Sequence, residues 1–255
     1  MANTAVELIQ FRMSHYNEKA RWALDFKQVP HSRRTLLPGP HRFVVKRLTG
    51  QTKTPVVRFG ETAVHGSADI IDELERRFPS PPLYPEETAD RTRALEIQDW
   101  LDGDIGPRIR RAALAAIVDD AGQISRTFAA DRSLPVRSLY RVMLPVARGM
   151  IKKGNGLTGQ ASVEDGYAAA AQALDFVVSQ AGDDGYLVGG RFSVADLTAA
   201  ALLAPAANPP DSPMTRPTPL SAPVAAWLDR WKDHPGTAWV HRQYRRHRPP
   251  SAQLH

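Results

Sequence analysis

Two hydroxyl side chains in one short turn, Ser14 and Tyr16, are the residues of this chain best suited to chemistry. The turn joins an apolar stretch typical of a β-strand, residues 6–11, to a helix-forming run, residues 18–24. A strand that leads directly into a helix brings backbone N–H groups and the positive end of the helix dipole to the turn, where they stabilise an anion such as a thiolate. A hydroxyl group there can donate a hydrogen bond to the thiolate and lower a thiol pKa that starts near about 8.5. Ser14 is therefore the first candidate for a thiol-activating residue, and Tyr16 is the second.

The same residues have structural interpretations. Serine before a helix commonly caps it, which stabilises the helix by about 1 kcal/mol. A tyrosine two residues into such a turn more often packs than reacts, and we expect His15 to be an exposed turn residue rather than a base. No nucleophile elbow accompanies Ser14, so the sequence does not predict a Ser/His/Asp triad.

The chain contains no cysteine and eight scattered histidines. The protein therefore cannot attack with a thiolate of its own, and any thiol chemistry must use a thiol that the ligand supplies. Nothing in this composition indicates an oxidising compartment. No histidine pair has the spacing of a zinc site on one helix face, so we predict no metal.

The formal net charge is +6, but four positive charges lie close to the C-terminus, at Arg242, Arg245, Arg246 and Arg248. Without a groove-reading motif, such a basic end predicts no nucleic-acid partner. The longest apolar run, residues 195–207, is interrupted by Asp196 and Pro205, and no basic segment precedes an apolar stretch at the N-terminus. The sequence thus predicts a cytoplasmic protein with no membrane partner.

A length of 255 residues allows two domains, each with its own core. The proline-rich segment at residues 78–85 is the natural boundary, so we expect one domain over residues 1–80 and a second, all-helical domain over residues 88–255. In the second domain the spacing of apolar residues predicts one long helix over residues 88–120 with a kink at Pro107.

Further elements follow in the same way. Residues 121–155 are less regular, with Pro135 and Pro145 bounding residues 136–144, and a nearly all-apolar helix at residues 193–204 belongs at the centre of a bundle. The last predictions are a helix over residues 162–181, a surface loop with seven prolines over residues 205–223, a last helix over residues 224–232 that Pro235 ends, and a tail packed through Trp239 and Tyr244.

A second group of residues matches a known pattern. Pro55 begins a β-branched strand, residues 60–61 form a turn before a short strand, and Gly66 and Ser67 open a helix. The order of strand–helix–strand and then strand–strand–helix resembles the thioredoxin-like half of the glutathione S-transferases. Residues 190–196 are similar to the capping-box segment of the helical half of that family. The resemblance implies an N-terminal thioredoxin-like α/β domain followed by a C-terminal all-α helical bundle.

The resemblance also implies roles for the second group. The Thr54–Pro55 bond would be cis, the backbone of Thr54 would pair with the cysteinyl part of glutathione, and Ser67 would bind the γ-glutamyl end. The family has an acidic or amide residue where this chain has Gly66, so Asp69 or a carboxylate of a partner subunit would hold the ammonium group. A carboxylate introduced at position 66 would strengthen binding unless the glycine has a positive φ. Lys53 would pair with the glycyl carboxylate, although a solvated lysine is an equally good interpretation.

The implied reaction is attack by a glutathione thiolate on a small electrophilic molecule, with glutathione as co-substrate. The resemblance also implies a homodimer and a role in detoxification. The second substrate would lie near Met13, Asp104, Arg108 and Arg111, with Tyr140 and Met143 as further candidates, although the arginines equally fit solvent-facing ion pairs. A glutathione-dependent isomerase and a non-catalytic binding or scaffold protein remain alternatives, because the fold does not decide among them.

Overall fold

The computed structural model describes residues 5–254, and its N-terminal part is a four-stranded mixed sheet in the order β2-β1-β3-β4. Strand β1 pairs in parallel with β2 and antiparallel with β3, and β3 pairs antiparallel with β4. The strands are β1 (Val6–Gln10), β2 (Ser32–Thr35), β3 (Val56–Phe59) and β4 (Thr62–His65). This arrangement confirms the thioredoxin-like prediction.

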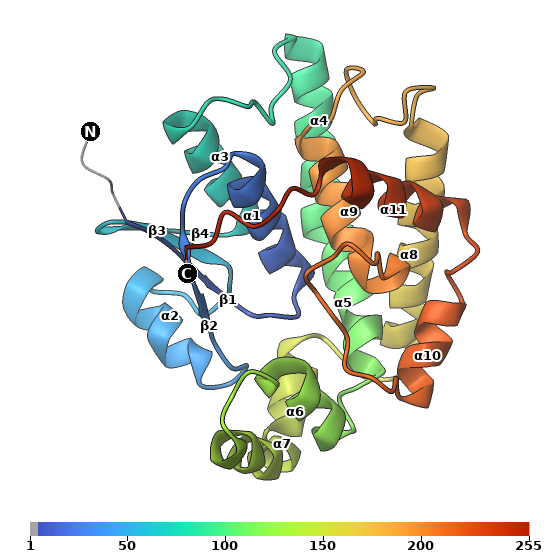
Figure 1. Ribbon diagram of the computed structural model, residues 1–255. Coiled ribbons are helices and arrows are strands. Elements are labelled where there is room, and N and C mark those ends of the chain that lie inside the picture. Colours follow the sequence, from blue (N-terminus) through green and yellow to red (C-terminus); the bar gives the residue numbers. More distant parts are fainter. Residues whose placement is uncertain (1–4, 255) are drawn as a thin grey trace.

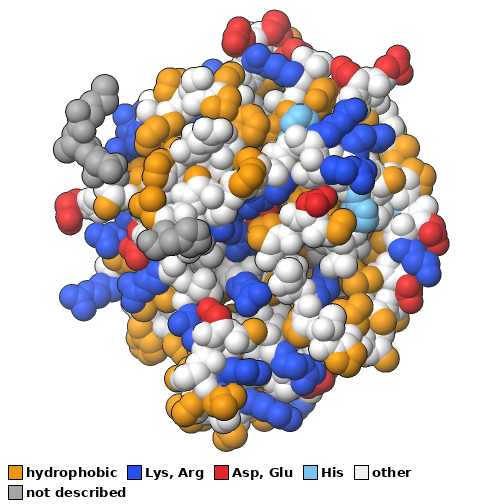
Figure 2. Space-filling model, in the orientation of Figure 1, with side chains coloured by type: hydrophobic (Ala, Val, Ile, Leu, Met, Phe, Trp, Pro, Cys, Tyr) orange, Lys and Arg blue, Asp and Glu red, His pale blue; other side chains and the backbone are white. Residues whose placement is uncertain are grey.

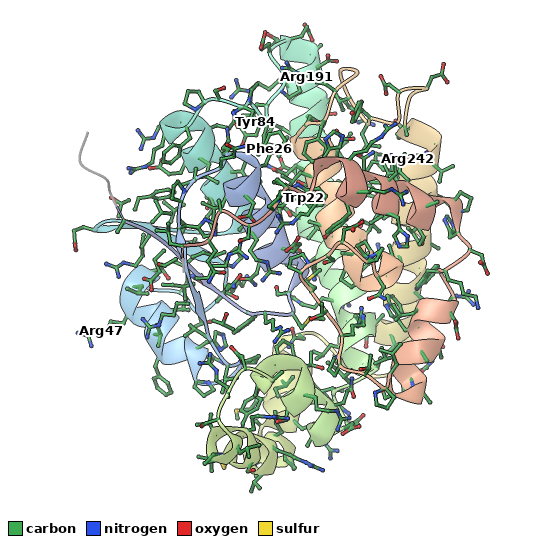
Figure 3. The ribbon with its side chains drawn as sticks, viewed as in Figure 1. Trp22, Phe26, Arg47, Tyr84, Arg191 and Arg242 are labelled. Carbon is green, nitrogen blue, oxygen red and sulfur yellow. The ribbon has the colours of Figure 1, made fainter. Side chains whose placement is uncertain are left out.

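Three helices flank the sheet: α1 (His15–Phe26), α2 (His41–Thr49) and α3 (Ser67–Arg77). Figure 1 shows α1 and α3 together on one face and α2 on the other. The side chains of Ile9, Val45 and Val56 form a small core under α2. On the opposite face, Trp22 and Phe26 of α1 point toward the helical part of the chain (Figure 3). The Trp22 ring stacks on the Phe192 ring, with 5.7 Å between the ring centroids. The sheet is therefore anchored to the helical domain through α1.

The rest of the chain is helical, which confirms the predicted all-α helical bundle. The central helix, α9 (Val194–Ala207), is buried along its length and begins with the predicted capping box of Ser193 and Asp196. The other helices of this part are α4 (Thr88–Trp100), α5 (Gly106–Ala115), α6 (Ala121–Ala129), α7 (Leu134–Gly154), α8 (Gln160–Gln180), α10 (Ala222–Asp229) and α11 (Pro235–His247). In Figure 1, α6 and α7 lie together, apart from α9. None of the helices described over residues 5–254 combines the length and hydropathy that crossing a membrane requires.

The predicted kink at Pro107 is replaced by a different interruption. Between α4 and α5 lies one π-helical turn, η1 (Leu101–Ile105), and Pro107 sits in the first turn of α5. A proline at that position loses no hydrogen bond that the helix requires. The α-helical pattern is therefore interrupted by the π-turn before the proline is reached.

Three other predictions that relied on prolines are also wrong. Residues 121–155 form two regular helices, and α7 continues through Pro145. The expected loop over residues 205–223 is shorter, because Pro205 lies inside α9 and Pro223 lies in the first turn of α10. Pro235 begins α11 instead of ending the last helix, since proline is well suited to a first helical turn. Trp239 and Tyr244 are buried on α11, which confirms that they pack the end of the chain.

An ion pair between the two halves of the molecule joins α1 to η1. The Lys19 side chain is fully buried, and its Nζ atom lies 2.5 Å from Asp102 Oδ2. Burial lowers the pKa of Lys19 and raises the pKa of Asp102, while each charge acts on its partner in the opposite direction. The pair is tolerated in the interior because the two charges compensate each other.

We therefore expect Asp102→Asn to lower the free energy of unfolding by about 3 kcal/mol or more, because it leaves the buried Lys19 ammonium without a counter-charge. The matched control is Asp104→Asn in the same π-turn, whose carboxylate is half exposed and pairs with Arg108. A surface pair of that kind is worth about 0–1 kcal/mol. Urea unfolding measures both variants. Equal losses of stability in the two variants would show that the buried Lys19–Asp102 pair contributes no more than the surface pair.

Candidate functional site

Ser14 lies at the N-terminus of α1 with extended backbone angles, φ −153° and ψ 123°. Its carbonyl accepts the first helical hydrogen bond, from Glu18 N at 2.8 Å, but its side chain makes no capping hydrogen bond. The hydroxyl is therefore not used to cap the helix and remains half-buried at the helix end. At that position it lies beside the N–H groups and the positive dipole end that stabilise an anion.

The loop before β3 is fastened to this turn. The Thr54–Pro55 peptide bond is cis, as the family resemblance implied. Asn17, on the first turn of α1 and fully buried, donates from Nδ2 to Thr54 Oγ1 at 3.2 Å. Gly66 N in turn donates to Pro55 O at 3.2 Å. These hydrogen bonds link the start of α1, the cis-proline loop and the start of α3.

At the start of α3, Gly66 is the N-cap with φ +88°, and Ser67 is the first helical residue rather than the cap. The Ser67 side chain is buried, whereas Asp69, in the first turn, is exposed. A Cβ placed on Gly66 would lie 3.4 Å from Asp69 Oδ2. A carboxylate is therefore present next to the position where the family's acidic residue is missing. Lys53, before the cis-proline, has an exposed side chain.

Tyr16 and His15 point into the domain junction. The Tyr16 hydroxyl donates to the backbone carbonyl of Asp102 at 2.6 Å, and burial, with a smaller contribution from the Asp102 carboxylate, raises the pKa of the phenol. His15 was expected to be exposed, but it is buried, with Nε2 3.2 Å from Gly106 O. Burial and, to a lesser degree, Arg110 lower the pKa of His15 to about 3, so the ring is neutral at pH 7. Both side chains anchor α1.

The residues expected to surround a second substrate do not line one pocket, because Met13 lies apart from the polar residues. Met13 lines a cavity of only about 20 Å³, which none of the predicted polar residues lines. The cations Arg108 and Arg111 form ion pairs with Asp165 of α8 at 2.8 and 3.2 Å, and Arg108 also pairs with Asp104. The arrangement is thus the ion-pair alternative that the sequence allowed.

The two further candidates also lie elsewhere. Tyr140 is buried in a small core between α6 and α7, and its hydroxyl donates to Pro38 O at 3.2 Å. Met143 is exposed on α7. The structure does not bring these two residues together with the ion-paired arginines of α5.

Sequence reasoning missed the residues that hold the turn in place. Asn17, Lys19, Asp102 and Gly106 connect α1 to the cis-proline loop, to η1 and to the first residue of α5. A Cβ on Gly106 would lie 2.5 Å from the Tyr16 hydroxyl oxygen, so glycine is required there for close approach. The only sequence signal was the glycine immediately before Pro107, to which the sequence analysis gave no role. Over residues 5–254, no three His, Asp or Glu side chains are grouped so that they could hold a metal ion.

The backbone of Gly66 generates a test. With φ at +88°, any L side chain is strained, so we expect Gly66→Ala to lower the free energy of unfolding by about 1–3 kcal/mol. The control is Gly103→Ala, because Gly103 has an ordinary φ and no atom within 4 Å of an added Cβ. That variant should be neutral or more stable by up to about 1 kcal/mol. Chemical denaturation measures the free energy of unfolding of both variants. An unchanged stability for Gly66→Ala would contradict the strain argument. The same strain would offset any gain from a carboxylate at position 66.

Comparison with known proteins assigns the fold to a family. Residues 8–82 match the glutathione S-transferase N-terminal domain, and residues 160–231 match the C-terminal domain of the same family. No curated protein sequence matches the chain.

Solved structures agree over almost the whole length. A glutathione S-transferase from Rhodospirillum rubrum is 16% identical with a TM-score of 0.62, and the alignment covers 96% of each chain. The β-etherase LigF from Sphingobium is 18% identical with a TM-score of 0.58 and covers 94% of this chain and 99% of that one. A glutathione S-transferase from Methylobacterium radiotolerans, in complex with glutathione sulfonate, is 22% identical with a TM-score of 0.55 and covers 96% and 95%. With its two matched domains and its fold, the chain belongs to the glutathione S-transferase family.

Proposed function

We propose that this protein is a glutathione transferase in which Ser14 activates the glutathione thiol for attack on a small electrophile. The observation that carries the proposal is the Ser14 hydroxyl at the N-terminus of α1, which makes no capping hydrogen bond and lies on the turn next to the cis-proline loop that Asn17 holds. A hydroxyl donor and a helix N-terminus both favour the thiolate form of a bound thiol. Solved relatives that contain glutathione or glutathione sulfonate support the choice of thiol.

The geometry favours Ser14 over Tyr16. The Tyr16 hydroxyl already donates its single proton to Asp102 O, and the burial that raises its pKa makes the phenolate unfavourable. Removing it from that bond would leave a buried carbonyl without its donor. Ser14 has no such engagement in the first turn of α1.

We propose roles in glutathione binding for four further residues. Thr54 would pair through its backbone with the cysteinyl unit, and the N-terminus of α3 with Ser67 would receive the γ-glutamyl carboxylate. Asp69 would hold the ammonium group, and Lys53 the glycyl carboxylate. We also propose that the two domains extend over residues 1–80 and 88–255 and that the protein acts in the cytoplasm, consistent with a chain that has no cysteine.

Ser14→Ala should lower kcat/KM for glutathione conjugation by roughly 10- to 1000-fold, as expected for the loss of one preorganised donor, with an unchanged melting temperature. Tyr16→Phe is the comparison. It should lower stability, because Asp102 O loses its donor, but leave most of the activity of the folded enzyme. The measurement is steady-state kinetics with a panel of electrophiles at fixed glutathione. Full activity of Ser14→Ala together with loss in Tyr16→Phe would transfer the role to Tyr16.

Calorimetric titration with glutathione separates catalysis from binding alone. Binding without turnover of any electrophile would favour the non-catalytic alternative, and turnover without net consumption of glutathione would favour the isomerase. Absence of glutathione binding would overturn the proposed function.

A homodimer is part of the proposal, since members of the family typically form dimers. In this chain α7 exposes large apolar side chains spaced by three or four residues, among them Leu139, Val142 and Val146, and such a surface is typical of a protein interface. Light scattering should give about twice 28.1 kDa.

The double variant Leu139→Asp/Val146→Asp should give the monomer mass, because it places charges in the buried contact. Val178→Asp, which changes an exposed apolar residue of α8, is the control and should stay dimeric. A wild-type monomer at micromolar concentration would reject the dimer.

A further inference from the structure

A cavity of about 510 Å³ opens at the β2 edge of the sheet. Its walls come from the ends of β1 and β2, from α1, from the turn between α6 and α7, and from the C-terminal tail. The tail is fixed along β2 by the hydrogen bond from Leu254 N to His31 O at 2.8 Å. In Figure 2, Lys and Arg side chains gather around a hollow near the centre of the visible face. The volume lies within the range of sites for small molecules.

The lining of this cavity is strongly basic. Asp131 is the one acidic residue in it, and five arginines line it: Arg12, Arg21, Arg33, Arg34 and Arg132. Guanidinium groups present planar pairs of N–H donors that match carboxylate and phosphate oxygens. A cavity with this composition is suited to an anion.

The charges behind the cavity wall do not balance. Two buried carboxylates of α1, Glu18 and Asp25, are shared by three guanidinium groups. Glu18 pairs with Arg21 at 2.7 Å, and Asp25 pairs with Arg33 at 2.7 Å. Arg248, from the end of the chain, contacts both carboxylates, at 2.8 and 2.9 Å. This buried cluster therefore holds one positive charge more than its carboxylates neutralise.

One of these guanidinium groups has unused hydrogen-bonding capacity. The Arg21 side chain is 3% exposed, and its Nη1 atom donates to Gln10 Oε1 at 2.8 Å. Its Nη2 atom has no hydrogen-bond partner among the described residues. An unsatisfied buried donor on a charged group is costly, and a bound anion would remove that cost.

We propose that this cavity binds a small organic oxyanion, a molecule that carries carboxylate or phosphate groups, through Arg12, Arg21 and Arg132. Arg12 is available for this role: its Nη2 atom donates to the neutral Thr215 hydroxyl, at 3.1 Å, and it forms no ion pair with any described residue. Arg132, on the opposite wall, donates to Thr35 O. Its Nε atom has no hydrogen-bond partner among the residues described, and its only contact with a charge there is a long ion pair with Asp131 Oδ1, at 3.7 Å.

The site is separate from the one built around Ser14. Pro55 precedes β3 and Ser67 follows β4, on the far side of β1 from the edge strand β2. Only the loop after β1 is shared, because Arg12 faces the cavity and Ser14 begins α1. The inference therefore does not depend on the proposed transferase activity.

The test is calorimetric titration of the full-length protein with citrate and with inorganic pyrophosphate at constant ionic strength. The wild type should bind at least one of them at millimolar concentration or better, and the preferred probe tells whether carboxylate or phosphate is recognised. Arg12→Gln/Arg132→Gln should weaken binding by about tenfold or more, through loss of charge-assisted hydrogen bonds. Arg12→Gln alone, which removes no ion pair with a described residue, should weaken binding in the same direction if the double variant is unstable.

The matched control, Arg42→Gln/Arg47→Gln, removes two exposed charges from α2, where Arg47 projects away from the molecule (Figure 3), and should bind as the wild type does. Glutathione affinity should be the same with and without the anion. No binding of either probe by the wild type, equal losses in the two double variants, or competition between the anion and glutathione would overturn the proposal.

Discussion

The attachment of the first turns of α1 to the π-helical turn η1 is the constraint on which the site depends. Three side chains of α1 make it: His15 lies against Gly106 O, Tyr16 donates to Asp102 O, and Lys19 pairs with the Asp102 carboxylate. A regular α-helix at this point would follow a different path, because the π-turn adds one residue to the turn. The sheet and the helical bundle are thus joined at the residue next to Ser14, and the start of α1, to which Ser14 belongs, is held from both domains.

Because of this attachment, the polar residues of α1 have different roles. Tyr16 and His15 are used for anchoring, whereas the Ser14 hydroxyl at the helix end makes no capping hydrogen bond. Asn17 extends the constraint to the cis-proline loop. One helical turn further, Arg21 pairs with the buried carboxylate of Glu18 and also lines the basic cavity at the β2 edge. One helix therefore carries the domain junction, the candidate thiol site and one wall of a second, anion-binding site.

The sequence predicted those features that have local signals. The apolar pattern and turn residues predicted β1, β3, β4 and the start of α3, but not β2, and Ser193 with Asp196 predicted the start of α9. It did not predict the π-turn, because nothing in the apolar spacing of residues 88–120 distinguishes a π-turn from a kinked α-helix. The roles of Lys19 and Asp102 depend on a contact between residues 83 positions apart, which no local pattern reveals. The positive φ of Gly66 and the burial of His15 are likewise consequences of tertiary structure.

The central claim is that Ser14, held at the end of α1 by this junction, stabilises a bound glutathione thiolate. The most direct measurement is the pKa of the thiol of protein-bound glutathione, followed by the ultraviolet absorbance of the thiolate as pH is varied, in the wild type and in Ser14→Ala. We predict a bound-thiol pKa clearly below the value of about 8.5 for a free thiol in the wild type and a return toward that value in Ser14→Ala. Identical titration curves for the two proteins would contradict the account.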